Sequence, residues 1–387
     1  MLPRVRLALA ALAMSLSLAA PSAPQAADKG GPVKPDSSRL GHEVVPTAQG
    51  VKLWVNADQK DYRGTVAIAL KVAKRSSSFR FHAQSLEITS TRLTGKKGAV
   101  PVTLGAEDHG IVTATCGVPL DPGAYTLTIE FTNEFNTQAA SLYKLWTRGS
   151  AYTFTQFESD DARGAFPCWD EPAFKIPWQM TLVVPKKHVA IANTPVERET
   201  VDGDQKTVVF KTSPPMSSYL VAIATGPFET VDIPGMSIPG RVITIKGQSG
   251  MAGETVKMTP PLLKALEAYF QRPYPYEKLD VLAVPEYWYG AMENAGAITF
   301  RDNILLIDPT TANDEQRRRL AEIMAHELAH MWFGDLVTME WWDDMWLNES
   351  FASWMGDKIT NEVAPEYHVA DDQVSSMLRA MVVDSRL

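Results

Sequence analysis

His326-Glu327-Leu328-Ala329-His330 is the stretch that predicts both a helix and a metal site. Residues four apart on a helix lie about 40° apart in rotation and about 6 Å apart along the axis, so His326 and His330 project from one face. Two neutral imidazoles at that spacing can bind one Zn²⁺. Glu327 lies between them in the sequence and points past the metal. That position suits a base that takes a proton from metal-bound water.

Glu349 is the candidate third ligand, because a catalytic zinc keeps three protein ligands and one open position. Eighteen residues separate it from His330. Apolar residues recur at helical spacing in residues 348–355, so the third ligand is expected from a second helix. Two helices with a remote Glu have the gluzincin form and lack the His-rich continuation of metzincins. The alternative is a core helix whose two histidines are satisfied by ordinary hydrogen bonds.

Length and composition indicate a soluble globular protein. With 387 residues the chain should form two or three domains. The hydrophobic content of 45% and charged content of 21% allow a large core. A net charge of −8 and the lack of a basic run argue against nucleic-acid binding. Two cysteines favour free, buried thiols, while one disulfide between Cys116 and Cys168 stays open.

The first residues have the pattern of an export signal. Arg4 and Arg6 form a basic start, and the apolar run from Leu7 to Ala20 is too short to span a bilayer comfortably. We expect a signal peptide at 1–27 and a flexible lead-in at 28–39. The mature chain would be periplasmic or secreted, with no membrane span after signal removal. An uncleaved membrane anchor is the alternative.

From residue 40 to residue 230 the sequence predicts a β domain. Short runs rich in β-branched and aromatic residues are separated by turn signals such as Asp121-Pro122-Gly123, which is typical of a β-sandwich-like domain. The runs that predict strands are 62–72, 85–91, 110–115, 125–131, 178–184, 207–211 and 219–225.

The pattern changes near residue 231, and residues 231–387 are expected to form a thermolysin-like zinc catalytic domain, incomplete at its end. A helix is predicted at 253–272 and a buried strand at 279–285. Two more strands are expected at 298–300 and 304–307. A helix from Asn313, its candidate N-cap, to about Leu336 would carry the histidine pair. The fold class is therefore α+β with several domains.

Two further segments carry candidate binding residues. Gly290-Ala291-Met292-Glu293-Asn294 follows the strand at 279–285, and such an edge can hold an extended peptide by strand addition. The alternative is a turn with a solvated Glu. Gln156-Phe157-Glu158 runs into the acidic, aromatic and Pro-bounded segment 160–172. The alternative there is an ordinary surface loop.

These motifs together resemble the M1 family of zinc aminopeptidases. The residues that carry the resemblance are Gly-Ala-Met-Glu-Asn at 290–294, the His-Glu-x-x-His motif and the Glu eighteen residues later. The likeness continues through Trp332-Phe333-Gly334, Leu336-Val337-Thr338 and Trp346-Leu347-Asn348-Glu349. Residues 156–175 resemble the β-domain segment of the family. The likeness spans roughly residues 40–360.

The resemblance implies a role for each matching residue. The zinc ligands would be His326, His330 and Glu349, and the general base would be Glu327. Two carboxylates would bind the free α-amine of a peptide substrate, and they are Glu293 and Glu158. Gln156 would line the first specificity pocket. The rest of the substrate-binding segment would be Gly290, Ala291, Met292 and Asn294. Carboxylates fixed beside the zinc admit one residue before the scissile bond, which makes an exopeptidase.

The chain departs from the family pattern at single positions and in length. Met331, Asp335 and Ser350 stand where many members have Gln, Asn and Gly, and none of them is a ligand. Family members place a transition-state tyrosine several dozen residues after the third ligand, whereas this sequence ends thirty-eight residues after Glu349. Tyr367 is not assigned that role.

We therefore expect a chain shortened at its C-terminus, which would expose apolar surface where a helical region of the same enzyme docks. Most of the tryptophans near the site are expected in the core, and they are Trp332, Trp341, Trp342, Trp346 and Trp354. Two alternatives to a zinc aminopeptidase stay open. One is a non-catalytic or weakly active fragment that binds zinc and peptide. The other is a thermolysin-like endopeptidase, which needs no amine anchor.

Overall fold

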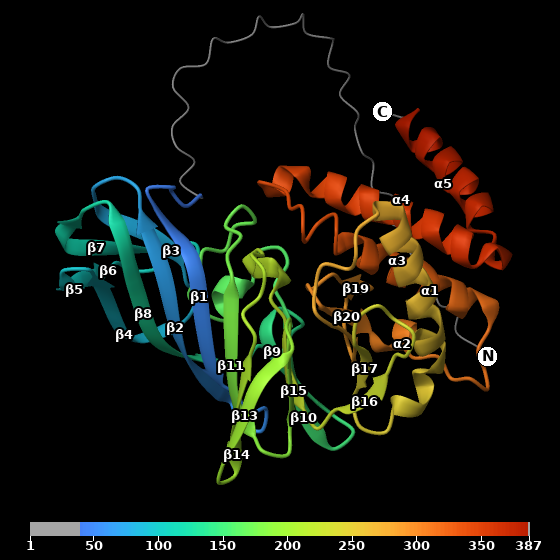
Figure 1. Cartoon of the computed structure of the whole chain (residues 1–387), viewed down its shortest axis with the longest axis horizontal. Coiled ribbons are helices and arrows are strands. Elements are labelled where there is room, and N and C mark those ends of the chain that lie inside the picture. The colour runs from blue at the N-terminus through green and yellow to red at the C-terminus, as the bar shows by residue number, and fades with distance from the viewer. Residues whose placement is uncertain (1–38, 386–387) are drawn as a thin grey trace, which may run out of the picture. The chain divides into compact units, whose positions relative to one another are not determined.

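Alternating buried and exposed side chains build the largest sheet of the computed structural model, which describes residues 39–385 (Figure 1). In β2 (Asp61–Val72) every second side chain is buried, as expected for a strand with one face on the core. The sheet has eight strands, in the order β13 (Val196–Asp202), β14 (Gln205–Phe210), β11 (Trp178–Pro185), β1 (Val44–Trp54), β2, β8 (Gly123–Glu134), β4 (Glu87–Gly95) and β5 (Gly98–Val100). Only β1 and β11 pair in parallel within this sheet.

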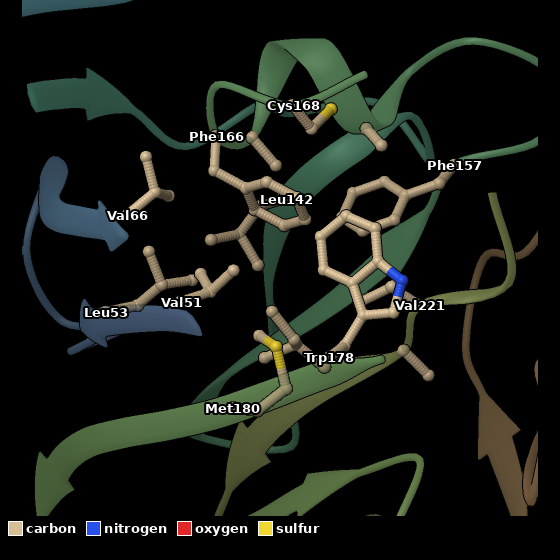
Figure 2. Packing of buried hydrophobic residues seen from close by; sticks show 14 of the residues in the cluster. Val51, Leu53, Val66, Leu142, Phe157, Phe166, Cys168, Trp178, Met180 and Val221 are labelled. Atoms are coloured by element: carbon tan, nitrogen blue, oxygen red, sulfur yellow. The ribbon is translucent and has the colours of Figure 1, made fainter. Parts of the chain in front are cut away.

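Two smaller sheets complete the β-rich part. One contains β3 (Ser76–His82), β7 (Ile111–Leu120) and β6 (Val102–Leu104), and the other contains β12 (Val189–Ala192), β15 (Ile223–Gly226), β10 (Ser150–Gln156) and β9 (Ser141–Thr147). Figure 2 shows how Trp178 of β11 reaches toward Phe157 and Phe166 in the core. The ring centroids of Phe166 lie 5.9 Å from Trp178 and 5.7 Å from Phe157. The buried Phe157 thus fixes the backbone between Gln156 and Glu158.

A third sheet belongs to the C-terminal half. Its order is β16 (Glu229–Asp232), β17 (Gly240–Thr244), β18 (Leu279–Val284), β20 (Ala297–Arg301) and β19 (Ala291–Met292). The three central strands are parallel and the two edge strands are antiparallel. All residues of β18 are buried, as is usual for a parallel strand covered on both faces. β16 begins at Glu229, so this sheet includes the residues at the boundary expected near 230.

Helices pack beside this sheet in a second hydrophobic core. The α-helices are α1 (Gly253–Phe270), α2 (Asp302–Leu305), α3 (Asp314–His330), α4 (Met345–Val363) and α5 (Val369–Asp384), and the 3₁₀ turns are η1 (Ala162–Gly164), η2 (Ser218–Leu220), η3 (Ser249–Met251), η4 (Trp342–Asp344) and η5 (Pro365–Tyr367). Asn313 caps α3 in a capping box with Gln316. Within residues 39–385, the helices lack the combination of length and apolar character needed to cross a bilayer.

The α+β class predicted from the sequence is confirmed. The N-cap at Asn313 is confirmed too, as are the free and buried thiols of Cys116 and Cys168. The signal peptide predicted for 1–27 lies outside the described residues, and so does the lead-in predicted for 28–39 except at its last residue. The β-rich and helical parts pack as one compact unit from Leu40 onward.

Several predicted elements are wrong in detail. Residues 304–307 do not form a strand, because Asp302–Leu305 closes a single helical turn, and a short apolar run does not distinguish the two. The helix that starts after Asn313 ends at His330 instead of near Leu336. Only the last part of 219–225 is a strand, since a 3₁₀ turn occupies Ser218–Leu220.

The expectation that most of the tryptophans near the site are core residues is also wrong. Only Trp332 is buried among the five, while Trp346 and Trp354 are 63% and 48% exposed. They lie on α4, whose buried face is formed by smaller residues such as Ala352. Tyr367 packs against the second hydrophobic core.

Candidate active site

Two helices bring the three predicted metal ligands together. His326 and His330 lie one turn apart near the end of α3, and Glu349 lies in the second turn of α4. The Nε2 atoms of the two histidines are 2.9 Å apart. Oxygens of Glu349 lie 3.4 Å from His326 Nε2 and 3.6 Å from His330 Nε2. The three side chains therefore converge on one point.

The close approach of α4 to α3 depends on Gly356. A Cβ atom added at this position would lie 3.0 Å from the Glu322 carbonyl oxygen and 3.2 Å from the His326 nitrogen. Those distances are too short for a side chain to fit without movement of the helix backbones. A glycine here thus lets α4 carry Glu349 up to the histidine pair.

Second contacts orient the two imidazole rings. His330 Nδ1 lies 3.2 Å from the Phe333 carbonyl oxygen. A carbonyl only accepts hydrogen bonds, so Nδ1 carries the proton and Nε2 keeps a free lone pair that can bind a metal ion. His326 Nδ1 lies 3.4 Å from Ser353 Oγ. Ser353 was not predicted from the sequence, although its place one helical turn after Glu349 was a usable signal.

Glu327 lies buried in the wall of the same site, only 4% exposed. Its Oε2 atom has no hydrogen-bond partner among the described residues. Burial raises the pKa of Glu327 to about 8, with the charge of His326 opposing the shift and the charges of Glu349 and Glu158 adding to it. A carboxyl group with a pKa near neutrality can both take up and return a proton.

Two more carboxylates meet Glu349 from the other side. Oxygens of Glu158, Glu293 and Glu349 lie within 4.8 Å of one another. All three line a cavity of about 390 Å³, together with His326 and Glu327. Glu293 is only 3% exposed, so the alternative of a turn with a solvated Glu is wrong. The surface-loop alternative for 160–172 is wrong as well, because most of that segment is buried.

The cavity contains more negative than positive charge. Burial raises the pKa of Glu293 well above its ordinary value, and the charge of Glu158 raises it further. Burial, reinforced by Glu349, raises the pKa of Glu158 to about 7, although His326 opposes the shift. Burial also lowers the pKa of His330 to about 4. Such shifts mark a site that a cation would stabilise.

Some residues of the segment Gly290–Asn294 line the cavity, and the others lie in the layer behind the lining. Gly290, Ala291 and Glu293 line the cavity. β19, with Ala291 and Met292, is an edge strand that pairs only with β20 among the described strands. Strand addition of an extended peptide at this edge stays a prediction.

Gln156, Met292 and Asn294 are buried behind the lining residues. Tyr287 donates a hydrogen bond from its hydroxyl to Gln156 Oε1, and Gln156 Nε2 lies 3.7 Å from Met292 Sδ. Thr299 Oγ1 lies 3.3 Å from Asn294 Oδ1. Direct contact of Gln156, Met292 and Asn294 with a substrate stays a prediction. Tyr287 was not predicted from the sequence, and it connects the segment between β18 and β19 to the β-rich part.

A buried polar contact holds the backbone after Glu293 against the β-rich part. Asn193 donates from Nδ2 to the Ala295 carbonyl oxygen at 3.0 Å. Lys278 Nζ donates to the Gly296 oxygen at 2.8 Å and to the Ala192 oxygen at 2.7 Å. Gly296 has φ +70° and lies so close to Asn193 that a Cβ would clash with its carbonyl oxygen at 2.6 Å. These contacts, which no local sequence pattern revealed, fix the position of Glu293.

The donor set fits a zinc ion. With Zn–N distances of about 2.0–2.1 Å, two ligand atoms of a tetrahedral site lie about 3.3–3.5 Å apart. The distances of 2.9, 3.4 and 3.6 Å between the three donors bracket that range. Unpartnered buried oxygens on Glu158, Glu293 and Glu327, within the described part of the chain, also call for positive charge.

Comparison with known proteins places the chain in a family. Residues 45–220 match the Peptidase M1 N-terminal domain, and residues 254–386 match the Peptidase family M1 domain. Aminopeptidase N of Acetobacter pasteurianus is 36% identical over 329 residues, which cover 82% of this chain and 91% of that relative. The chain belongs to peptidase family M1.

Other M1 relatives are much longer. Aminopeptidase M1-B of Oryza sativa subsp. japonica is 37% identical over 338 residues, or 86% of this chain and 38% of the relative. Puromycin-sensitive aminopeptidase of Caenorhabditis elegans is 35% identical over 353 residues, or 87% of this chain and 37% of the relative. The chain therefore spans about two fifths of the length of these relatives.

Asp335 is a buried acid close to the site. It is fully buried, and both of its carboxylate oxygens lack hydrogen-bond partners among residues 39–385. Burial raises the pKa of Asp335 well above its ordinary value, Lys175 opposes the shift, and Glu327 and Glu158 add to it. Lys175 Nζ bonds to the carbonyl oxygens of Asp335 and Leu336 instead of to the carboxylate.

We predict that Asp335→Asn stabilises the protein at neutral pH. The folded state holds a proton on Asp335 that the unfolded chain releases above its ordinary pKa. The free energy that the wild type loses by keeping this proton therefore grows as the pH rises above the ordinary pKa of Asp, and it vanishes below about pH 4. Removing an unsatisfied buried acid should add about 1–3 kcal/mol to the free energy of unfolding at pH 8. Urea unfolding of both proteins at pH 4 and at pH 8 measures the difference in the free energy of unfolding at each pH.

The exposed Asp344, in the turn before α4, offers a matched control. Asp344→Asn should change the free energy of unfolding by less than about 0.5 kcal/mol at either pH. An Asp335→Asn protein that is less stable than the wild type at pH 8, or that shows the same difference at both pH values, would contradict the prediction.

Proposed function

We propose that the chain is a zinc-dependent aminopeptidase that removes N-terminal residues from peptides with a free N-terminus. One observation carries the proposal. Carboxylate oxygens of Glu158 and Glu293 lie within 4.8 Å of those of Glu349, which is itself within 3.6 Å of both histidine Nε2 atoms. A site for an ammonium group therefore adjoins a site for a metal ion. The names of the M1 relatives agree with this proposal.

The proposed ligands of the ion are His326, His330 and Glu349. When bound there, zinc supplies Lewis-acid chemistry, which makes a carbonyl group more electrophilic and water more acidic. The contact of His330 Nδ1 with the Phe333 carbonyl oxygen keeps Nε2 of His330 available for it, and Ser353 can accept a hydrogen bond from His326 Nδ1 to the same effect.

Glu158 and Glu293 would select the substrate. An ammonium group between two carboxylates gains charge-assisted hydrogen bonds that a neutral amide cannot make. Since these carboxylates adjoin the ligand cluster, only the first peptide bond reaches Glu327. This selection favours an exopeptidase over a thermolysin-like endopeptidase. The free edge of β19 would align the peptide backbone at Gly290 and Ala291.

Glu327 would move the protons of the reaction. It takes a proton from the attacking water at one carboxylate oxygen and later delivers it to the leaving amine. A pKa raised toward 8 lets Glu327 hold that proton between the two steps. The unpartnered Oε2 atom, in the part of the chain described here, faces no competing donor.

We further propose that the mature chain works in the periplasm or outside the cell, as the N-terminal residues 1–27 indicate. N-terminal sequencing of the protein recovered from the periplasm or the medium tests this placement. A recovered protein that still begins at Met1 would contradict it. A C-terminal helical region of the same enzyme is a proposed further partner.

The aminopeptidase proposal predicts that a free aminoacyl anilide is hydrolysed and its N-acetyl form is not. Acetylation removes the charge that Glu158 and Glu293 would bind, so kcat/KM should fall at least about a hundredfold. Release of the aniline by the zinc-loaded chain measures both rates. Glu293→Gln should reduce the rate on the free form and leave the acetylated form unchanged. Equal cleavage of both forms would contradict the amine site, and cleavage of neither would favour a binding fragment.

Replacing the proposed base gives a separate prediction. Glu327→Gln should lower kcat by about 10²–10⁴-fold, because the amide cannot accept the proton. Zinc content, measured by elemental analysis, should remain that of the wild type, since Glu327 is not a ligand. Glu322→Gln, on the same helix and paired with Arg318, is the control and should retain activity. A Glu327→Gln protein with wild-type kcat would remove the assigned base.

A further inference from the structure

The carboxylates around the cavity exceed what one zinc ion and one ammonium group neutralise. Glu158, Glu293, Glu327 and Glu349 all line it. A zinc ion offsets two of these charges, and an ammonium group offsets one more. With all four carboxylates ionised, one formal negative charge then stays in the cavity, where unpaired charge is costly. A second divalent ion in place of the ammonium would balance the four carboxylates.

The environment of Glu293 is separate evidence for such a ligand. Glu293 lines the cavity and its side chain is only 3% exposed. Its Oε1 atom has no hydrogen-bond partner within residues 39–385. The contacts that hold Ala295 and Gly296 fix the backbone just after Glu293, so this carboxylate is held in place by the fold. A buried carboxylate that is held in a fixed position without a hydrogen-bond partner indicates a position where a ligand can bind.

The described residues contain two groups of side chains with metal-binding spacing. One is His326, His330 and Glu349, and the other is Glu158, Glu293 and Glu349. We propose that Glu158, Glu293 and Glu349 form a second site, for an oxygen-preferring divalent cation of the Mn²⁺ or Ca²⁺ class. The ion would occupy the place of the substrate ammonium group. That overlap rests on the proposed function, whereas binding of the ion does not depend on it.

Donor type and spacing decide the class of ion. The second site offers only carboxylate oxygens, which suit Mn²⁺, Mg²⁺ and Ca²⁺, while the histidine pair of the first site suits zinc. Two ligands of one ion cannot lie farther apart than twice the bond length. That limit is about 4.6–5.2 Å for Ca²⁺ with bonds of 2.3–2.6 Å, and the observed oxygens lie within 4.8 Å.

Glu349 belongs to both groups, so it would bridge the two ions with its two oxygens. Bridged metal pairs in hydrolytic enzymes lie about 3.5–4 Å apart, which a single carboxylate can span. The second ion and a peptide N-terminus would neutralise the same Glu158 and Glu293. They therefore exclude each other, and the second ion acts as a competitive inhibitor that leaves the zinc site intact.

Binding of Mn²⁺ to the zinc-loaded full chain tests this proposal without any need for turnover. The electron paramagnetic resonance signal of free Mn²⁺ disappears when the ion binds, so a titration counts the sites. One Mn²⁺ per chain is expected while the zinc content stays constant, because zinc outcompetes Mn²⁺ at sites with histidine ligands. Glu293→Gln should weaken Mn²⁺ affinity at least about tenfold.

Glu322→Gln is the matched control, because Glu322 lines the same cavity but is paired with Arg318 and lies outside the trio. Its Mn²⁺ affinity should stay within about twofold of the wild type. If the chain hydrolyses the anilide, Mn²⁺ should raise KM and leave kcat unchanged. Absence of Mn²⁺ binding to the wild type, or equal binding by wild type and Glu293→Gln, would overturn the second site. Failure of hydrolysis alone would count against the proposed function and not against the site.

Discussion

Carboxylates that surround one cavity with too few cations are the constraint on which this site depends. Glu158, Glu293, Glu327 and Glu349 come from four different segments and surround one cavity. Each of the first three has a pKa raised above its ordinary value, and burial is the first cause in each case. Such an arrangement costs folding free energy, and proteins retain it where a ligand supplies the missing charge. A metal ion at the histidine pair and a cation beside it would supply that charge.

The rest of the fold keeps these side chains from moving apart. The core around Trp178 and Phe157 sets Glu158, and the buried donors Asn193 and Lys278 hold the backbone after Glu293. The glycine at 356 lets α4 approach α3, which brings Glu349 to the histidines. The β-rich part thus forms one wall of the site. Both M1 domains matched in the chain therefore contribute side chains to the cavity.

Local patterns in the sequence predicted the parts of the site that depend on helix geometry. His326 and His330 are one turn apart on any helix, and the spacing around Glu349 indicated a second helix. The pattern did not show where α3 ends, because the turn after His330 depends on contacts such as the bond of His330 to Phe333. It also did not show that Gln156 is buried behind the lining residues, since its partner Tyr287 lies 131 residues away. Long-range contacts of this kind leave no periodic signal.

The most direct test of the central claim is a crystal of the zinc-loaded chain measured at the zinc absorption edge. We predict one anomalous peak within bonding distance of His326 Nε2, His330 Nε2 and a Glu349 oxygen, about 2.0–2.2 Å from each. The same peak is expected in Glu293→Gln, because the carboxylate of Glu293 belongs to the second group of ligands only. No peak at the histidine pair, or a peak held by other residues, would contradict the account.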